Sequence, residues 1–185
     1  LTGFIAVAGP EDQSYALKND GTVWKWGSSP LGDGTGNSSS PPVQVIGPGG
    51  VGFLTGITAI SGGEHYSSRA LKNDGTVWSW GNNGYGALGD GTTNSSFVPV
   101  QVIGPGGIGF LTGIKAIETG GHNQTLALKN DGTVWAWGRN DYGQIGDGTS
   151  GVGNDRYTPV QVIGPGSTGF LTGITSVAGG IWFSF

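Results

Sequence analysis

An eleven-residue segment that occurs three times constrains the fold of this chain more than any other feature. The copies span residues 17–27, 71–81 and 128–138, and they differ only at the residue between the two tryptophans. Each copy reads Leu-Lys-Asn-Asp-Gly-Thr-Val-Trp-x-Trp-Gly. Asn-Asp-Gly before a β-rich run indicates a hairpin, because a tight primed turn needs backbone angles that glycine, asparagine and aspartate adopt at low cost. The segment therefore predicts a turn followed by a strand.

Within the predicted strand, side chains alternate between two faces. The two tryptophans are two residues apart and share one face, whereas the valine and the variable residue share the other. The variable residue is Lys25, Ser79 or Ala136. The segment recurs after 54 and then 57 residues. A period of this length predicts a repeat protein with units at 1–53, 54–110 and 111–170, followed by 171–185 as a partial fourth repeat or a strand donor.

Each repeat contains four short β-rich segments separated by glycine-rich turns. In the second repeat they are 57–60, 65–72, the Trp-x-Trp strand and 99–103. The first segment recurs at 4–7, 114–117 and 174–177. No helical period appears, and four short antiparallel strands per repeat are typical of a propeller blade. We therefore expect an all-β fold of about three four-stranded β-propeller blades plus a partial fourth, incomplete as a ring.

The composition fits a folded chain that does not bind nucleic acid. The chain has 40 Gly, but its seven Trp, seven Phe and five Tyr allow the strands to bury apolar surface. Its net charge is -4 and its eight Lys and Arg are scattered, whereas nucleic-acid binding requires clustered cations. No apolar stretch is long enough to cross a bilayer, so no membrane insertion is expected. The absence of Cys excludes a thiolate metal site and fits any redox compartment.

The best copy of the repeat runs from Ala127 to Thr149 and continues into Pro-Val-Gln-Val. With His122 before it, this pattern resembles the regulator of chromosome condensation repeat, and we expect the bacterial or archaeal type. The resemblance covers nearly the whole chain. It implies a β-propeller, commonly with seven blades, and a structural role for the histidine. It also implies that loops around a central channel can bind other proteins.

An array of three blades cannot close, because propellers need at least four. The flat face of each terminal blade would then stay exposed, and large exposed apolar faces are normally association sites. Since the repeats complement one another, we expect a homo-oligomer or polymer, either a ring or a filament. The aromatic tail contributes self-association candidates that could add to a neighbouring strand edge: Ile181, Trp182, Phe183 and Phe185. The alternative is that the tail belongs to a longer closed propeller.

No motif in the sequence indicates catalysis. The two histidines, His65 and His122, occupy the same repeat position, and this favours a structural role. Three aspartates in Gly-Asp-Gly-Thr supply one carboxylate per loop, fewer than a calcium site needs, so turns explain them better. We therefore expect a non-enzyme with no catalytic residue, no cofactor and no metal site.

The loops vary between repeats more than the strands do, and they hold the candidates for a protein contact. Aromatic and arginine residues dominate such contacts, and the candidates are Tyr85, Arg139, Tyr142, Arg156 and Tyr157. Packing over the sheet edge is the alternative role for these side chains. Three Asn-x-Ser/Thr sequons give glycosylation candidates, or chance matches in a chain rich in these residues, at Asn37, Asn94 and Asn123.

Three classes of function are compatible with these features. The first is a self-associating structural protein outside the cell or on its surface, which the near-identical repeats favour. The second is a protein-binding propeller, inhibitor-like or adhesin-like, that uses its variable loops. The third is the nucleotide-exchange and chromatin role of the eukaryotic namesake of the family, which the acidic charge balance disfavours.

Overall fold

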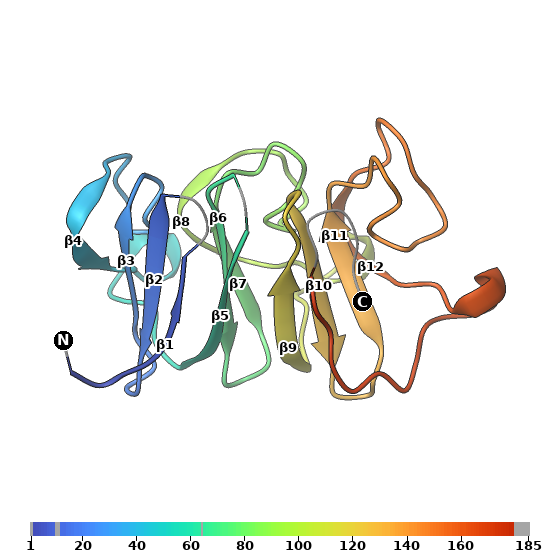
Figure 1. Ribbon diagram of the computed structural model, residues 1–185, viewed down its shortest axis with the longest axis horizontal. Coiled ribbons are helices and arrows are strands. Elements are labelled where there is room, and N and C mark those ends of the chain that lie inside the picture. Colours follow the sequence, from blue (N-terminus) through green and yellow to red (C-terminus); the bar gives the residue numbers. More distant parts are fainter. Residues whose placement is uncertain (1, 10–11, 64, 180–185) are drawn as a thin grey trace.

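Three four-stranded antiparallel sheets lie side by side in the part of the chain that the computed structural model describes, residues 2–9, 12–63 and 65–179 (Figure 1). The first sheet contains β1 (Phe4–Ala8), β2 (Gln13–Lys18), β3 (Val23–Gly27) and β4 (Ser39–Gln44). The second contains β5 (Ile57–Gly63), β6 (Ser67–Lys72), β7 (Val77–Gly81) and β8 (Ser96–Gln101). The third contains β9 (Ile114–Thr119), β10 (Gln124–Lys129), β11 (Val134–Gly138) and β12 (Arg156–Gln161). The predicted all-β fold of antiparallel blades, not closed into a ring, is confirmed.

Short 3₁₀ turns follow each sheet, at η1 (Pro48–Gly50), η2 (Pro105–Gly107) and η3 (Pro165–Ser167). The first of the two tryptophans in each repeat is fixed by the hairpin turn. In the second repeat, the Asp74 carboxylate accepts hydrogen bonds from the Thr76 amide at 3.0 Å and from its hydroxyl at 2.6 Å. The Trp78 indole then donates to the same hydroxyl at 3.2 Å. No helix in the described part of the chain has the length and apolarity to cross a membrane.

The segment 174–177 does not form the strand expected of a fourth repeat. No regular strand is assigned between residues 171 and 178. The chain there is held by backbone bonds from Leu171 to Val162 and from Ile174 to Gly132. β1, β5 and β9 differ because each pairs along its length with the second strand of its own sheet. The prediction of a strand at 174–177 was therefore wrong.

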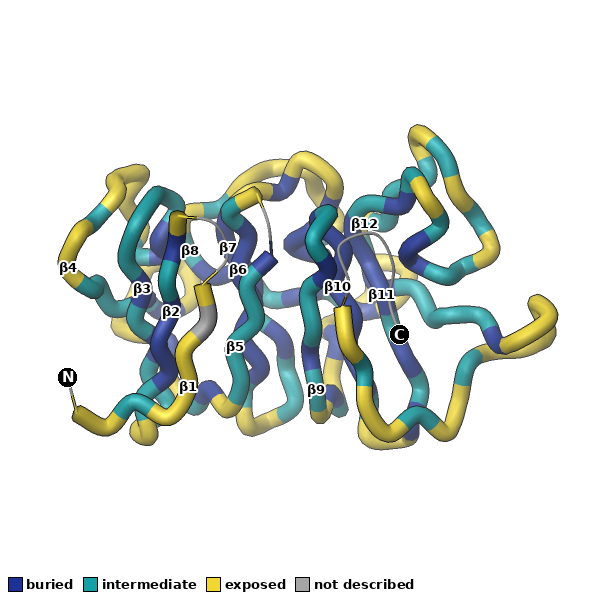
Figure 2. The backbone as a smooth tube through the Cα atoms, viewed as in Figure 1, coloured by how far each residue is buried: buried dark blue, intermediate teal, exposed yellow. Residues whose placement is uncertain are grey.

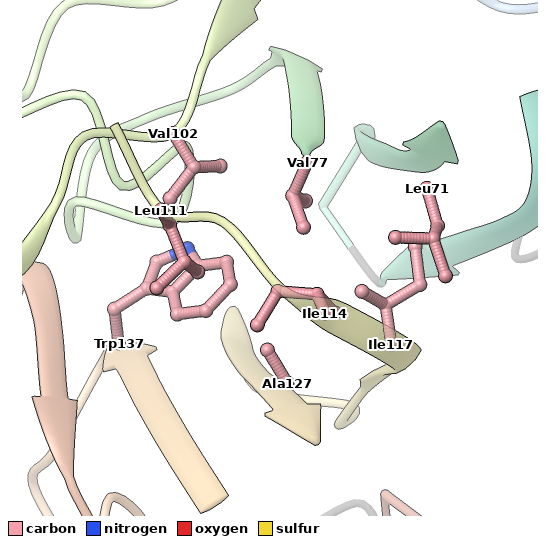
Figure 3. Packing of buried hydrophobic residues seen from close by; sticks show 8 residues of the cluster. All are labelled: Leu71, Val77, Val102, Leu111, Ile114, Ile117, Ala127 and Trp137. Atoms are coloured by element: carbon pink, nitrogen blue, oxygen red, sulfur yellow. The ribbon is translucent and has the colours of Figure 1, made fainter. Parts of the chain in front are cut away.

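Adjacent sheets are joined by apolar clusters that combine strands of one repeat with the first strand of the next. The joint between the second and third sheets is shown in Figure 3, and its buried members are Leu71, Val77, Val102, Leu111, Ile114, Ile117, Ala127 and Trp137. An equivalent cluster around Trp80 joins the first and second sheets. Trp80 and Trp137 are both 0% exposed. The second tryptophan of the second and third repeats is therefore part of the core between two sheets.

A buried polar chain crosses the joint between the first two sheets. The Lys25 ammonium donates to the Pro30 carbonyl at 2.6 Å and to the Ser68 hydroxyl, in the next sheet, at 2.9 Å. Ser68 in turn donates to the Tyr15 hydroxyl at 3.0 Å. Burial, together with the nearby charge of Arg69, lowers the pKa of Lys25 to about 7. The variable position between the two tryptophans therefore faces a neighbouring repeat.

Replacing Lys25 with Met should change how stability depends on pH. A lysine with a pKa of 10.5 in the unfolded chain and about 7 in the folded chain makes the unfolded state bind more protons between these values. The free energy of unfolding of the wild-type chain should thus rise as pH rises from 7 to 9, by up to about 1.4 kcal/mol per unit. Urea unfolding at pH 7, 8 and 9 measures this slope. Equal slopes for the wild type and Lys25→Met would contradict the assignment.

Candidate interaction surfaces

A tryptophan of one repeat lies on a loop glycine of the repeat before it. Trp137 contacts Gly89, where an added methyl group would lie 2.7 Å from the indole nitrogen. Gly32 has the same relation to Trp80, also at 2.7 Å. The Trp137 indole donates to the Ala87 carbonyl at 3.1 Å, which fixes the ring against the loop. We call this arrangement the tryptophan–glycine joint.

The first sheet exposes the face that the other two sheets bury in this joint. Strand register places Val7, Ser14 and Trp26 where the second sheet has Ile60, Ser68 and Trp80. Val7 is 76% exposed, and much of β1 is exposed (Figure 2). Trp26 is only half-buried, whereas its two equivalents are fully buried. A shallow hollow runs between Val7, Gly9, Ser14, Tyr15 and Trp26. We call this surface the open face of repeat 1.

The opposite end of the array carries the complementary half of the joint. Gly146 corresponds to Gly32 and Gly89, but an added methyl group there would meet only Val162. The apolar cluster of the third sheet includes Leu126 and Ala136, with the partly buried side chains of Leu171, Ile174 and Val177 packed against it. Among the described residues, no further sheet packs on this end.

A second surface lies on the loop side of the second and third sheets. The Arg139 guanidinium stacks over the Tyr85 ring at 4.6 Å and pairs with the Asp141 carboxylate at 2.6 Å. The same guanidinium lies 3.4 Å from His122, whose ring centroid is 6.3 Å from that of His65. Burial opposes the charged form of Arg139, but Asp141 outweighs it and the pKa of Arg139 is raised. We call this group the loop cluster.

Two of the five predicted loop residues, Tyr85 and Arg139, belong to this cluster. Tyr142 lies in the same loop as Arg139, whereas Arg156 and Tyr157 are the first two residues of β12. Tyr142, next to Asp141, is 63% exposed. Arg156 pairs with the Asp147 carboxylate and donates to Thr149 at 3.0 Å. Tyr157 packs on Gly86, where an added methyl group would lie 2.4 Å from its ring. Tyr85 and Arg139 are therefore brought together, while Arg156 contacts its own repeat and Tyr157 packs on the loop of the repeat before it. A contact of any of the five with another protein stays a prediction.

The remaining predicted sites are the self-association candidates in the tail and the three glycosylation candidates. The tail residues Ile181, Trp182, Phe183 and Phe185 lie outside the described residues. Asn37 and Asn94 are exposed, as a glycan requires. Asn123 is only 3% exposed beside the start of β10, so the folded chain does not offer it for glycosylation and this candidate is corrected. The sequon alone carries no information on burial.

The Gly-Asp-Gly-Thr aspartates serve as turn residues. The Asp90 carboxylate accepts from the Thr92 amide at 3.0 Å and from its hydroxyl at 2.9 Å, and Asp33 and Asp147 do the same with their own threonines. Among the described residues, no group of three or more His, Cys, Asp or Glu could hold a metal ion. The local hydrogen bonds account for these carboxylates.

Sequence reasoning missed two buried cations, Lys25 and Arg69. Arg69 is 1% exposed on β6 and donates across the next joint to Thr125 at 2.9 Å. The sequence did contain a signal for this burial. Side chains alternate between the two faces of a strand, and in stacked sheets both faces are covered, so a cation within a strand is buried on either face. Each of these cations donates both within its own repeat, to the Pro30 or Ala87 carbonyl, and across a joint, to the Ser68 or Thr125 hydroxyl.

The chain matches known families along most of its length. A family model described as "Regulator of chromosome condensation (RCC1) repeat" matches residues 74–128 and 131–185. A second model with the same description matches residues 57–87 and 114–144. These matches confirm the predicted family at the level of the repeat.

The relatives are longer eukaryotic proteins. The human E3 ubiquitin-protein ligase HERC2 is 33% identical over 144 residues, which are 73% of this chain and 3% of that protein. The ultraviolet-B receptor UVR8 of Arabidopsis thaliana is 32% identical over 166 residues, 88% of this chain and 35% of the receptor. This chain therefore spans about a third of UVR8 and a small part of HERC2.

Solved structures share the fold. Prp20p from Saccharomyces cerevisiae aligns with a TM-score of 0.74 at 20% identity, over 98% of this chain and 43% of Prp20p. Human WBSCR16 aligns with a TM-score of 0.65 at 20% identity, over 98% of this chain and 57% of that protein. At this identity the likeness concerns the propeller fold alone.

A pair of glycine substitutions should measure the tryptophan–glycine joint. Gly89 and Gly109 have similar positive φ angles of 66° and 62°, but nothing lies within 4 Å of a methyl group added at Gly109. Gly109→Ala should therefore lower the free energy of unfolding by about 1 kcal/mol through backbone strain alone. Gly89→Ala should lower it by about 1–3 kcal/mol more, because it also overlaps Trp137. Urea unfolding compares the two, and equal losses would contradict the joint.

Proposed function

We propose a function on the premise that this chain belongs to the regulator of chromosome condensation repeat family. In this proposal, the chain is a non-catalytic repeat scaffold that binds a second copy of itself through the open face of repeat 1. Continued head-to-tail, this contact builds a ring if the rotation closes and a filament if it does not.

One observation supports this proposal: the first sheet exposes a face whose equivalents on the second and third sheets are buried. Val7, Ser14 and Trp26 repeat the residue types that the second and third sheets bury against a preceding repeat. A Trp side chain contributes up to about 4–6 kcal/mol on full burial by area alone, before the cost of association is subtracted. A surface with the residue types of an internal joint is best matched by another repeat of this chain.

The complementary end of a second copy has a suitable glycine. Gly146 can receive Trp26 as Gly32 receives Trp80. The segment 171–177, Leu-Thr-Gly-Ile-Thr-Ser-Val, resembles Leu-Thr-Gly-Phe-Ile-Ala-Val at 1–7. One of these two segments must give way when the copies join, and 171–177 is the less firmly held because it forms no strand. The incoming copy therefore supplies β1 in place of 171–177.

A second function, binding of another protein through the loops, is favoured by the loop cluster. Tyr85, stacked under Arg139, is 37% exposed and Tyr142 is 63% exposed, and such side chains are common at the centres of protein interfaces. This role corresponds to the inhibitor-like or adhesin-like alternative. If Tyr85→Ser and Tyr142→Ser abolished self-association, the loops rather than the open face would carry the contact between copies.

A longer closed propeller is an alternative in which a preceding repeat covers the open face. The bacterial or archaeal type of repeat, a location outside the cell or on its surface, and glycans on the exposed Asn37 and Asn94 are proposed with the scaffold role. If treatment with an N-glycosidase left the mass of the native protein unchanged, the proposal that Asn37 and Asn94 carry glycans would be wrong.

Trp26→Gln should weaken association of the 185-residue chain. Losing a buried interface tryptophan costs about 2 kcal/mol or more, so the dissociation constant should rise about thirtyfold or more. Sedimentation velocity over a range of concentrations measures this constant. Phe53→Gln is the matched control, because Phe53 is a large aromatic residue, 56% exposed, that lies in a linker outside the open face.

Two outcomes would overturn the proposal. The first is a wild-type chain that is folded and monomeric throughout the micromolar range. The second is equal weakening by Trp26→Gln and Phe53→Gln, since this would indicate non-specific apolar association. A circular dichroism spectrum of each variant establishes that it is folded before the comparison is made.

A further inference from the structure

The fourth strand of one repeat docks on the repeat before it. The Gly34 amide donates to the Phe97 carbonyl of β8 at 3.1 Å, and the Gly91 amide donates to the Tyr157 carbonyl of β12 at 3.0 Å. β8 also contacts η1, and β12 contacts η2. An extended segment therefore lies against the Gly-Asp-Gly-Thr loop and the 3₁₀ turn of the preceding repeat. We call this place on a repeat the strand groove.

The two segments that occupy strand grooves have the same chemistry. Both consist of an aromatic residue, a β-branched residue and a proline, at 97–99 and 157–159. A methyl group added to Gly36 would lie 3.7 Å from the Phe97 ring, and one added to Gly86 would overlap the Tyr157 ring. Both prolines are buried. Each aromatic ring thus packs on a loop glycine of the repeat before it.

The third repeat has the same groove, and no strand of a further repeat lies in it among the described residues. A shallow hollow of about 420 Å³ is found there. Its lining includes the residues that correspond to Gly86, to Gly34 and Gly91, and to Gly36, namely Gly143, Gly148 and Ser150. The hollow is therefore formed by the counterparts of the residues that hold β8 and β12.

Gly148 lacks both contacts that its counterparts make. Its amide has no hydrogen-bond acceptor among the described residues, whereas the amides of Gly34 and Gly91 each have one. A methyl group added to Gly148 would meet only Ile163 within 4 Å in the described part of the chain. At Gly34 it would also meet Val98 at 3.8 Å, and at Gly91 it would also meet Thr158 at 3.9 Å. A backbone donor and an apolar contact are thus free in this groove.

The fourth strand of the first repeat, β4, has a different segment at the matching place. Residues 40–42 are Ser-Pro-Pro, so they supply a carbonyl but no aromatic ring and no β-branched residue. A head-to-tail contact with a second copy through the open face would therefore leave the aromatic contact of this groove unmade. That contact is best matched by a segment of another protein.

We propose that the strand groove of the third repeat binds an extended segment of another protein, in which an aromatic and a β-branched residue precede a proline. The carbonyl of the aromatic residue accepts from the Gly148 amide, and its ring packs on Gly143 and Ser150. A segment bound in this way gains affinity from its main chain and specificity from its side chains. The site does not depend on self-association.

Two peptides from this chain form a matched pair for the test. Residues 95–102 read Ser-Ser-Phe-Val-Pro-Val-Gln-Val, and residues 38–45 read Ser-Ser-Ser-Pro-Pro-Val-Gln-Val. In the folded chain both have a serine hydroxyl that donates to the carbonyl two residues later, at 2.6 Å in β8 and 2.8 Å in β4. The peptides differ only in the aromatic and β-branched residues that the groove should select.

Fluorescence anisotropy of each labelled peptide, titrated with the 185-residue chain, measures the two dissociation constants. We expect peptide 95–102 to bind about tenfold more tightly than peptide 38–45, because partial burial of a phenylalanine ring corresponds to about this factor. The same ratio is expected with Trp26→Gln, so the result is separate from self-association. Equal affinities would indicate that β4 of a second copy fills the groove. Equal affinities, or no binding of either peptide, would overturn the proposal.

Ser150→Trp should fill the groove and weaken binding of peptide 95–102 about tenfold. Val152→Trp is the matched control, because Val152 is 94% exposed in the same loop and does not line the hollow. Circular dichroism establishes that both variants are folded. If the two variants bound the peptide equally well, the peptide would bind elsewhere and the assignment to this groove would be wrong.

The intact mass of the native protein tests the origin of the segment. If the native chain continued beyond residue 185 into a further repeat, the fourth strand of that repeat would fill the groove. The proposal of a segment from another protein would then be overturned.

Discussion

Packing of a tryptophan against a glycine holds this array of sheets together. The indoles of Trp80 and Trp137 are fully buried only because Gly32 and Gly89 have no side chain at the points of contact. The sheets can approach closely enough for the first strand of one repeat to complete the apolar cluster of the repeat before it. This one contact explains why both the strand with its tryptophans and the Gly-Asp-Gly-Thr that begins at the contacting glycine recur in every repeat.

The positions that vary between repeats lie within the same joints. Their side chains make one joint more polar than another. Lys25 reaches Ser68 across the first joint, and Arg69 reaches Thr125 across the second. At the end of the third sheet, Leu126 and Ala136 form an apolar surface instead. Each joint thus has a common apolar part and an individual polar part. The polar part lowers the stability of the joint unless every buried polar group has a hydrogen-bond partner. Because only a matching neighbour supplies those partners, each joint is selective for its neighbour.

Much of the fold was predictable from local sequence, whereas most of the functional surface was not. Asn-Asp-Gly-Thr before Trp-x-Trp fixes a hairpin by hydrogen bonds within six residues, so sequence reasoning finds it. The burial of Lys25 and Asn123 depends on neighbouring strands that are distant in sequence. The segment 174–177 has the composition of a strand, but no strand is assigned there in the described part of the chain. The clustering of Tyr85 with Arg139 likewise depends on loops from two repeats meeting in space.

The shared tryptophan–glycine joint also has a consequence for how such a chain can evolve. A duplicated or deleted repeat brings a compatible tryptophan and a compatible glycine with it, so the array can change in length without any new apolar packing. The buried cations limit this freedom, because a transplanted repeat meets a neighbour with a different hydroxyl partner. Repeat number is therefore easily changed by recombination, while repeat order is restrained by a few polar side chains.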